Sequence, residues 1–478
     1  MFSRAFDEIR SAARRRIRGP VLALLAGLAL LAALPADCVR GQTSTETPSK
    51  LFSDAVSAAQ LGEYDTAIRD FNQLLAREPG NLKAALGLAA GYRKVHNFGA
   101  AQHVLDDAHR RHPQSAEPLA MLGDMDIETQ DYDHAIAHLH AALALDSGDV
   151  GSRVRLAVAY KAKAEFPEAL AQLEKVLARD PKNALAYFTR ADIESGQNHD
   201  EKALQDAEAA LRLQPENRRA RMQTGKILVR LGQSAPAPDA AADCSRAVEI
   251  LEPLVADRSA ASSKSEAHTD SADDDLVTRE HENDSEILYT LSHAYQCAGQ
   301  DERAQKNLAE FEIASQAERV KKDGQMQAKH LVEQANALAL KNDFQGSLDL
   351  LNQALEKDRA NGPAYSQLAK LYYSSGDLEK AGEAATHALA IDPYQPDFLY
   401  VRGKILEAQR QPAKALEAFE RATIVNPKES DAFFEMGLIY QQQNDHPRAL
   451  AAFKKAVALA PGDPDYARTL AALSAAHP

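Results

Sequence analysis

The sequence lacks the short motifs by which most catalytic and nucleotide-binding sites are recognised. Its 478 residues contain no glycine-rich phosphate loop, no nucleophile elbow and no Cys-x-x-Cys pair. Each of these motifs places a reactive or phosphate-binding group at a fixed spacing, so their absence removes the usual enzyme classes. We therefore expect a protein that is not an enzyme and that holds no cofactor and no metal.

An excess of positive charge is also missing. The chain has 55 Lys and Arg against 69 Asp and Glu, which gives a net charge of −14 and a pI near 5.6. A protein of this charge repels phosphate backbones. We therefore expect no nucleic-acid partner.

Long apolar runs are missing except near the N-terminus. Six arginines lie within residues 1–20, and residues 21–36 are apolar apart from Gly and Pro. This run is short for a membrane span of about 20 residues but suits the core of a signal peptide. We expect residues 1–36 to be a cleaved signal peptide and 37–47 a linker. An uncleaved anchor, the only source of membrane contact, is the alternative, and lipidation of Cys38 stays open.

The sequence does contain an internal repeat. Small residues recur in a register of 34 positions, and alanines recur twelve positions after many of them. Prolines such as Pro79, Pro181 and Pro393 close many of the units. Such self-similarity predicts a repeat array. The first ladder of small residues consists of Ala55, Ala89, Gly123, Ala157, Ala191, Gly225, Ser292, Ala335, Ala369, Gly403 and Gly437.

A single unit has the pattern of a helical hairpin. In residues 82–115, two helical stretches flank a polar turn at His96 and Asn97. Ala89 and Ala101 would face each other, so the helices can approach at the short end of the usual range of about 8–10 Å. Pro113, which closes the unit, cannot continue the second helix. One hairpin cannot bury its apolar face, so the hairpins are expected to stack into one continuous core.

This pattern resembles the tetratricopeptide repeat family over about 48–256 and 286–461. The period, both small-residue ladders and the prolines agree. The sequence departs from the family in having no Trp, whose usual place is taken by residues such as Leu51 and Phe433. The resemblance implies an all-α fold, a right-handed α-solenoid of about eleven helix-turn-helix repeats of 34 residues. A capping helix is expected near residues 465–475.

The register breaks between Gly225 and Ala335, where 42 residues exceed the length of two repeats. Residues 257–285 are rich in Ser, Asp, Glu and His and have no aromatics, so we expect an acidic disordered insertion. It would separate a first lobe, 48–256, from a second lobe, 286–478. Further extra residues would lengthen a helix that runs from about Glu302 towards Val332.

Two cysteines fall within the irregular part. In a stack of this family, Cys244 lies near the start of the second helix of the sixth unit, and Cys297 near the end of the first helix of the seventh. Those helices are antiparallel neighbours, so the resemblance implies a Cys244–Cys297 disulfide in an oxidising compartment. Two unrelated buried thiols are the alternative.

In this family the first helices of the hairpins line the concave surface. Their projected side chains are basic in the first lobe, which favours an acidic peptide or the C-terminus of a partner protein as ligand. Solvated groove walls are the alternative. The first-lobe groove residues are Lys83, Arg93, Lys94, Arg155, Lys161, Arg219, Lys226 and Arg230. The second-lobe groove residues are Asn336, Lys370, Tyr373, Tyr400 and Lys404.

Two other clusters receive structural interpretations. His134 and His138 share a helix face at i, i+4, a spacing that can hold a metal, but no third ligand is evident near them. Asp124, Asp126 and Glu128 are interpreted as a solvated helix face rather than an acid–base pair.

The sequence therefore favours a non-catalytic scaffold that holds peptides or partner proteins in the periplasm or cell envelope. Two alternatives stay open. One is an accessory subunit of an envelope enzyme or secretion complex whose catalytic subunit is separate. The other is a structural spacer without a specific ligand.

Overall fold

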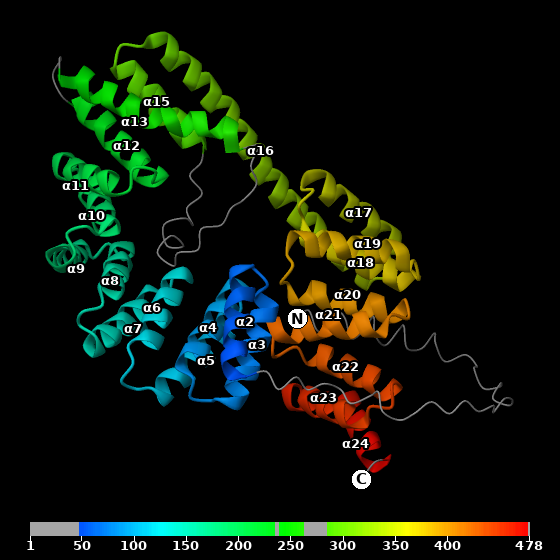
Figure 1. Ribbon diagram of the computed structural model, residues 1–478. Helices are drawn as coiled ribbons and strands as arrows, with labels where there is room; N and C mark the ends of the chain where they lie inside the picture. The colour runs from blue at the N-terminus through cyan, green and yellow to red at the C-terminus, as the bar shows by residue number, and fades with distance from the viewer. Residues whose placement is uncertain (1–46, 235–238, 262–283, 477–478) are drawn as a thin grey trace. The chain divides into compact units, whose positions relative to one another are not determined.

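The computed structural model describes residues 47–234, 239–261 and 284–476 (Figure 1). The expected signal peptide, Cys38 and most of the acidic insertion lie outside these residues. Two ends of the insertion are described, because α13 continues to Ala261 and α15 begins at Asp284. The helical boundaries therefore differ by a few residues from the expected 257–285.

The described residues form twenty-two α-helices and no β-strand, so the expected all-α repeat solenoid is confirmed. The helices are α2 (Pro48–Gln60), α3 (Tyr64–Arg77), α4 (Leu82–Lys94), α5 (Phe98–Arg111), α6 (Glu117–Glu128), α7 (Tyr132–Leu145), α8 (Val150–Ala162), α9 (Phe166–Arg179), α10 (Ala184–Gly196), α11 (Asp200–Leu213), α12 (Arg218–Ser234), α13 (Asp239–Ala261), α15 (Asp284–Cys297), α16 (Asp301–Leu340), α17 (Phe344–Lys357), α18 (Gly362–Ser375), α19 (Leu378–Ile391), α20 (Pro396–Ala408), α21 (Pro412–Val425), α22 (Ser430–Gln442), α23 (His446–Leu459) and α24 (Pro464–Ala476).

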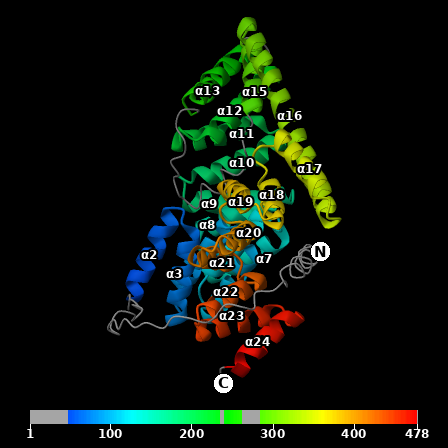
Figure 2. The ribbon, with the colours of Figure 1, turned by 90° about the vertical axis from the view of Figure 1, so that its right-hand side faces the viewer.

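Consecutive helices pack as hairpins, for example α6 with α7 and α20 with α21 (Figures 1 and 2). Many first helices begin at an Asn or Asp whose side chain accepts a backbone N–H two or three residues on. Asn183 accepts from Ala186 N and Asn361 from Ala364 N, both at 2.9 Å. Such caps satisfy N–H groups that the first turn of a helix leaves unpaired. The capping helix expected near 465–475 is α24.

The small-residue ladder marks the closest approach of the two helices in a hairpin. A Cβ built on Gly403 would lie 2.5 Å from Cε1 of Phe419, and one on Gly437 would lie 2.5 Å from Cε1 of Phe453. Ala89 and Ala157 occupy the same register and are fully buried. At Gly403 and Gly437 the phenylalanine ring of the second helix therefore occupies the space that a Cβ would take.

α16 replaces two helices of the regular pattern. It is 40 residues long and confirms the long helix expected from Glu302 towards Val332. Its first part follows α15 as a second helix, with the small residue Ala304 buried. Its last part carries Ala335, the first-helix ladder position of the next unit, which is fully buried. No proline interrupts the segment, so the helix continues where other repeats reverse direction.

The described residues divide into two compact units. The first contains residues up to Pro79, Lys94–Ala100 and Lys322–Pro478, and the second contains Gly80–Arg93 and Ala101–Lys321. Within the first unit, α3 packs against α21, and Asp65 forms an ion pair with Arg421 (2.5 Å). One of its core clusters centres on buried alanines and leucines of α16 to α19. The second unit has several such clusters, one of them over α12, α13 and α15.

Membrane crossing would require a long apolar helix. Within the residues that the structure describes, no helix combines the length and the apolar character that a bilayer span needs.

Candidate functional site

The first helices of the second unit carry a continuous series of charged contacts, which we name the charge ladder. It begins at Arg93 of α4, whose guanidinium lies 2.9 Å from Asp124 Oδ2 and 2.9 Å from Glu128 Oε2 on α6. Asp124 Oδ1 also lies 3.3 Å from Nε of Arg155 on α8. These side chains are mostly buried. Burial lowers the pKa of Arg93, but Asp124 and Glu128 outweigh it, so its pKa is raised overall.

The ladder continues through the following repeats. Lys161 of α8 pairs with Asp192 of α10. The guanidinium of Arg219 on α12 lies 5.1 Å from the ring centre of Phe188 on α10, within cation–π range. Lys226 of α12 then pairs with Glu286 of α15 (2.5 Å). The charged and aromatic side chains therefore connect α4, α6, α8, α10, α12 and α15.

Arg230 also belongs to this region. Its Nη2 lies 2.6 Å from Asp200 Oδ1 on α11 and also contacts the Ser195 hydroxyl on α10. Lys83 is exposed on α4, and Lys94, which falls in the other compact unit, is exposed at the end of that helix. Most of the expected groove residues are thus neutralised in place rather than presented as a free basic surface.

The interpretation of Asp124, Asp126 and Glu128 as a solvated face is wrong. Asp124 and Asp126 are only 8% exposed, and Glu128 is partly buried against Arg93. Burial is tolerated because each carboxylate has a charged or hydrogen-bonded partner. A signal for the pairs was present in the sequence. Asp124 and Glu128 follow Arg93 by 31 and 35 positions, and Asp192 follows Lys161 by 31, all close to one repeat.

The second-lobe residues form a separate polar cluster in the first unit. Lys404 Nζ of α20 lies 2.9 Å from Glu407 Oε2 and 3.0 Å from Glu435 Oε2 on α22. Burial lowers the pKa of Lys404, but the two carboxylates outweigh it and raise the pKa overall. Burial raises the pKa of Tyr373 nearby. Lys404 is therefore held as a charged ion pair with carboxylates from two repeats.

The other expected second-lobe residues lie on α16, α18 and α20. Burial lowers the pKa of Lys370 on α18, and the charge of Asp397 offsets part of that effect. The Tyr400 ring contacts Phe419, with 5.6 Å between ring centres. Asn336 lies half-buried on α16.

The histidines pair with carboxylates. His138 Nδ1 of α7 lies 2.7 Å from Asp126 Oδ2 of α6, and His134 Nδ1 lies 2.8 Å from Asp131 Oδ2. The hydrogen bond to Asp126 raises the pKa of His138 above its ordinary value. In the described ranges, no three His, Cys, Asp or Glu side chains come together in a way that could hold a metal ion.

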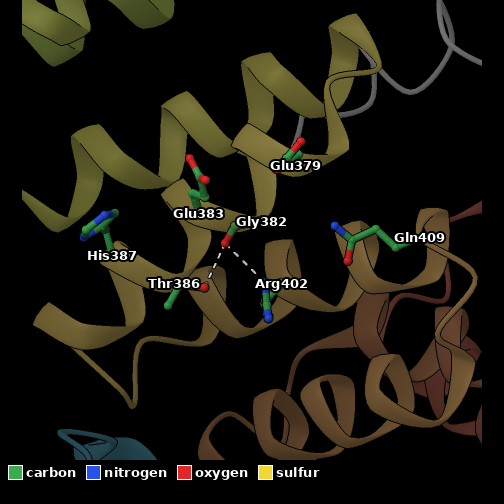
Figure 3. Close-up of a pocket in the computed structure, with 7 residues that line it drawn as sticks. All are labelled: Glu379, Gly382, Glu383, Thr386, His387, Arg402 and Gln409. Atoms are coloured by element: carbon green, nitrogen blue, oxygen red, sulfur yellow. Dashed lines mark hydrogen bonds between the residues drawn. The ribbon is translucent and has the colours of Figure 1, made fainter.

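An open pocket of about 400 Å³ lies between α19 and α20 in the first unit. Figure 3 shows Thr386 and Arg402 directed at the carbonyl oxygen of Gly382, to which they donate at 2.8 and 3.2 Å. Gln409 donates to the Leu378 carbonyl at 2.8 Å. These contacts hold the floor of the pocket together. Its exposed rim consists of Glu379, Glu383 and His387.

The irregular part of the second unit contains a disulfide between Cys244 of α13 and Cys297 of α15. Their Cα atoms are 5.7 Å apart, within the usual range for a disulfide. Gly232 of α12 lies directly beside it, because a Cβ there would come within 2.3 Å of Cys244 Sγ. Three helices therefore meet closely at this bond.

The helix pairs and the charge ladder together define an all-helical repeat scaffold. Models of the tetratricopeptide repeat match residues 58–125, 126–193 and 338–405, and a further tetratricopeptide model matches residues 400–464. Together these matches cover more than half of the sequence. The chain belongs to the tetratricopeptide repeat family, whose members typically bind protein or peptide partners and are not catalytic.

The search among curated proteins found no match. Among solved structures, MamA is 23% identical over 34% of this chain and 95% of its own, with a TM-score of 0.31. YrrB, titled a TPR protein with an unusual peptide-binding site, is 21% identical over 37% and 91%, with a TM-score of 0.31. A thermophilic TPR protein of Thermus thermophilus is 18% identical over 38% and 100%, with a TM-score of 0.33.

Proposed function

We propose that this chain is a non-catalytic scaffold that binds an acidic, extended segment of a partner protein along the charge ladder. The observation that supports this most is the continuity of the ladder over six helices. An extended segment is about 3.3 Å long per residue. It can therefore contact the corresponding positions of several successive repeats, which a single pocket cannot offer.

The ion pairs of the ladder differ in how readily a partner carboxylate can replace the carboxylate of the pair. Arg93, Asp124 and Glu128 are largely buried, so separating them would leave uncompensated charges and destabilise the fold. Lys161 and Lys226 are about a third or more exposed, and their partners Asp192 and Glu286 are more exposed still. Exposed ion pairs contribute little to stability. A partner carboxylate can therefore replace Asp192 or Glu286 at low cost.

Capture of the partner tests this proposal. The tagged full chain would be used to capture proteins from an envelope extract, with Lys161→Glu and Lys226→Glu combined as the variant. We expect the variant to lose the captured protein, and more completely at low salt, where charge repulsion is least screened. A matched control is Lys175→Glu with Lys202→Glu, which changes the same charge on exposed residues of second helices.

Two results would contradict the assignment. Equal capture by the ladder variant and the control would show that the charge ladder does not bind the partner. Loss of capture on changing Tyr373 and Tyr400 instead would place binding on the first unit.

We further propose that the protein acts outside the cytoplasm, in the periplasm or at the cell envelope. The Arg-rich segment followed by the apolar residues 21–36 supports export. The Cys244–Cys297 disulfide supports an oxidising compartment. The intact mass of protein from the envelope fraction tests both cleavage and location. A mass that includes residues 1–36 would show that this segment is not cleaved, and the segment would then be interpreted as a membrane anchor.

A further inference from the structure

The middle of α16 is half-buried on one side and exposed on the other. From residue 305 to residue 321 of the second unit, no side chain is buried. Three large apolar residues in this stretch are nevertheless exposed, of which Leu308, at 41%, is the least so. Ile313 is 72% exposed and Val320 is 60% exposed. In Figure 1, α16 is the long helix that follows α15.

The contacts of α16 show which of its faces is left uncovered. Ala304 is buried, the Phe311 ring lies 5.2 Å from that of Tyr289, and Ser285 donates to Glu318 (3.3 Å). These residues recur at intervals of seven, so they form one stripe that faces α15. At 100° per residue, Ile313 and Val320 lie on the opposite side of the helix.

The uncovered face has the pattern of a helix pairing seam. Ile313 and Val320 are seven residues apart, which brings them to the same side one heptad apart. Ala309 and Ala317 lie on the same side and are exposed, and their small side chains would let a second helix approach closely. β-branched residues in an exposed helix contribute neither helix propensity nor packing within one protomer.

We propose that this face binds the same face of a second copy of the chain, with the two α16 helices antiparallel. The charges beside the seam identify the occupant. Glu312 and Arg319 each precede an apolar seam residue, and both are exposed on the same flank. In an antiparallel pair related by a two-fold axis, same-flank positions face each other. Glu312 then faces Arg319 of the second copy, and Arg319 faces Glu312 of the second copy.

The pairing direction follows from the same residues. In a parallel pair, Glu312 would face position 317 of the second copy, which is an alanine, and both charges would lose their partners. The face is therefore its own complement only in the antiparallel arrangement. This proposal goes beyond the scaffold function, because it would join two copies of the charge ladder into a bivalent assembly.

Sedimentation of the purified full chain at increasing protein concentration tests the proposal. We expect wild type to self-associate into dimers, and the variant Ile313→Asp with Val320→Asp to stay monomeric. Unchanged helical content and melting temperature in that variant would show that the loss is not unfolding. The proposal is overturned by a wild type that is monomeric throughout, or by a double variant that dimerises as well as wild type.

Charge reversal tests the antiparallel geometry separately. Glu312→Lys alone and Arg319→Glu alone should each weaken self-association roughly ten-fold, since two attractive pairs become repulsive. Mixing these two variants should restore dimers, because every facing pair is then opposite in charge. The matched control Lys321→Glu, which lies off the seam, should dimerise like wild type. Failure of the mixture to dimerise better than either variant alone would overturn the antiparallel pairing.

Discussion

At the scale of single residues, the turns inside the regular hairpins that the structure describes depend on one residue with left-handed backbone. Gly62, His96, Gln130, Ala164 and Asn198 all have φ between 56° and 76°, and they are spaced 34 residues apart. Glycine adopts this conformation freely, whereas a residue with a Cβ is disfavoured in it. The left-handed turn conformation therefore recurs at this repeat position even where the residue is not glycine.

The strain at Ala164 yields a stability prediction. Replacing Ala164 by Gly should raise the free energy of unfolding by up to about 1 kcal/mol, because the steric cost at φ 60° is removed. Chemical denaturation measures the change. The matched control is Ala157→Gly, a helical and fully buried position of the same repeat, which should destabilise the protein. Destabilisation by both substitutions would contradict this explanation.

His138 is the residue for which the structure predicts a pH effect. Its strongest stabilising contact is the hydrogen bond to Asp126, and the charges of Asp106 on α5 and Asp131 before α7 act in the same direction. The pKa in the folded state is therefore above the unfolded value. The contact contributes stability that is fully present below the unfolded pKa and is lost as the pH rises through the folded pKa.

Replacing His138 by Gln should therefore destabilise the protein more at about pH 5.5 than at about pH 8.5, by roughly 1 kcal/mol. Denaturant unfolding at both pH values measures the difference. His134→Gln is the control, since the His134 side chain is 70% exposed beside Asp131, and exposed pairs contribute little to stability. An equal loss at both pH values for His138→Gln would contradict the role of the charged form.

At the scale of helices, close approach within a hairpin requires complementary sizes at two ladder positions. Ala89 and Ala157 stand sixteen residues before Leu105 and Leu173, and all four side chains are fully buried. Gly403 and Gly437 stand sixteen residues before Phe419 and Phe453. At these two positions the ring leaves no room for a Cβ on the facing helix, and Leu139 likewise occupies the Cβ space of Gly123.

The close contact between Gly403 and Phe419 predicts a rescue. Gly403→Ala should destabilise the protein by about 1–3 kcal/mol, because the new Cβ overlaps the Phe419 ring. Adding Phe419→Leu reproduces the Ala–Leu combination of other repeats and should cost less than the sum of the two single changes. Thermal or denaturant unfolding of the two single variants and the double variant measures the coupling. Simple additivity of the two losses would show that overlap with the Phe419 ring is not the cause of the loss.

At the scale of the whole molecule, the disulfide closes the irregular part of the stack. It joins residues 53 positions apart and so encloses the insertion in one loop. A loop of this size restricts the unfolded polypeptide, which stabilises the folded protein by about 4 kcal/mol in the chain-entropy model. The absence of a Cβ at Gly232 on α12 leaves the space that the sulfur atoms of Cys244 and Cys297 occupy.

Gly232→Ala should therefore hinder the bond. We expect free thiol at both cysteines in the denatured, non-reduced variant, and none at Cys244 and Cys297 in wild type treated the same way. Mass spectrometry after alkylation reports each site separately. Gly196→Ala provides the control, since a Cβ at Gly196 meets no other atom within 4 Å. Two alkylated cysteines in wild type would contradict the disulfide.

The sequence by itself determined the repeat, the all-α fold, the long helix and the cap, because these features follow from local periodicity. Prolines, ladder alanines and turn residues act within one hairpin and are spaced by one period, so they can be recognised in the sequence. The family assignment follows from the same regularity.

Only the tertiary structure decided which charges meet. Arg93, Lys161 and Lys226 were placed correctly on first helices, but their carboxylate partners come from other helices of the stack. Whether a projected lysine is free or neutralised depends on distances of a few Å between helices, which periodicity does not report. The sequence does not reveal the uncovered face of α16 for the same reason. Its exposure depends on which side of the helix α15 occupies, and only the packed structure shows that side.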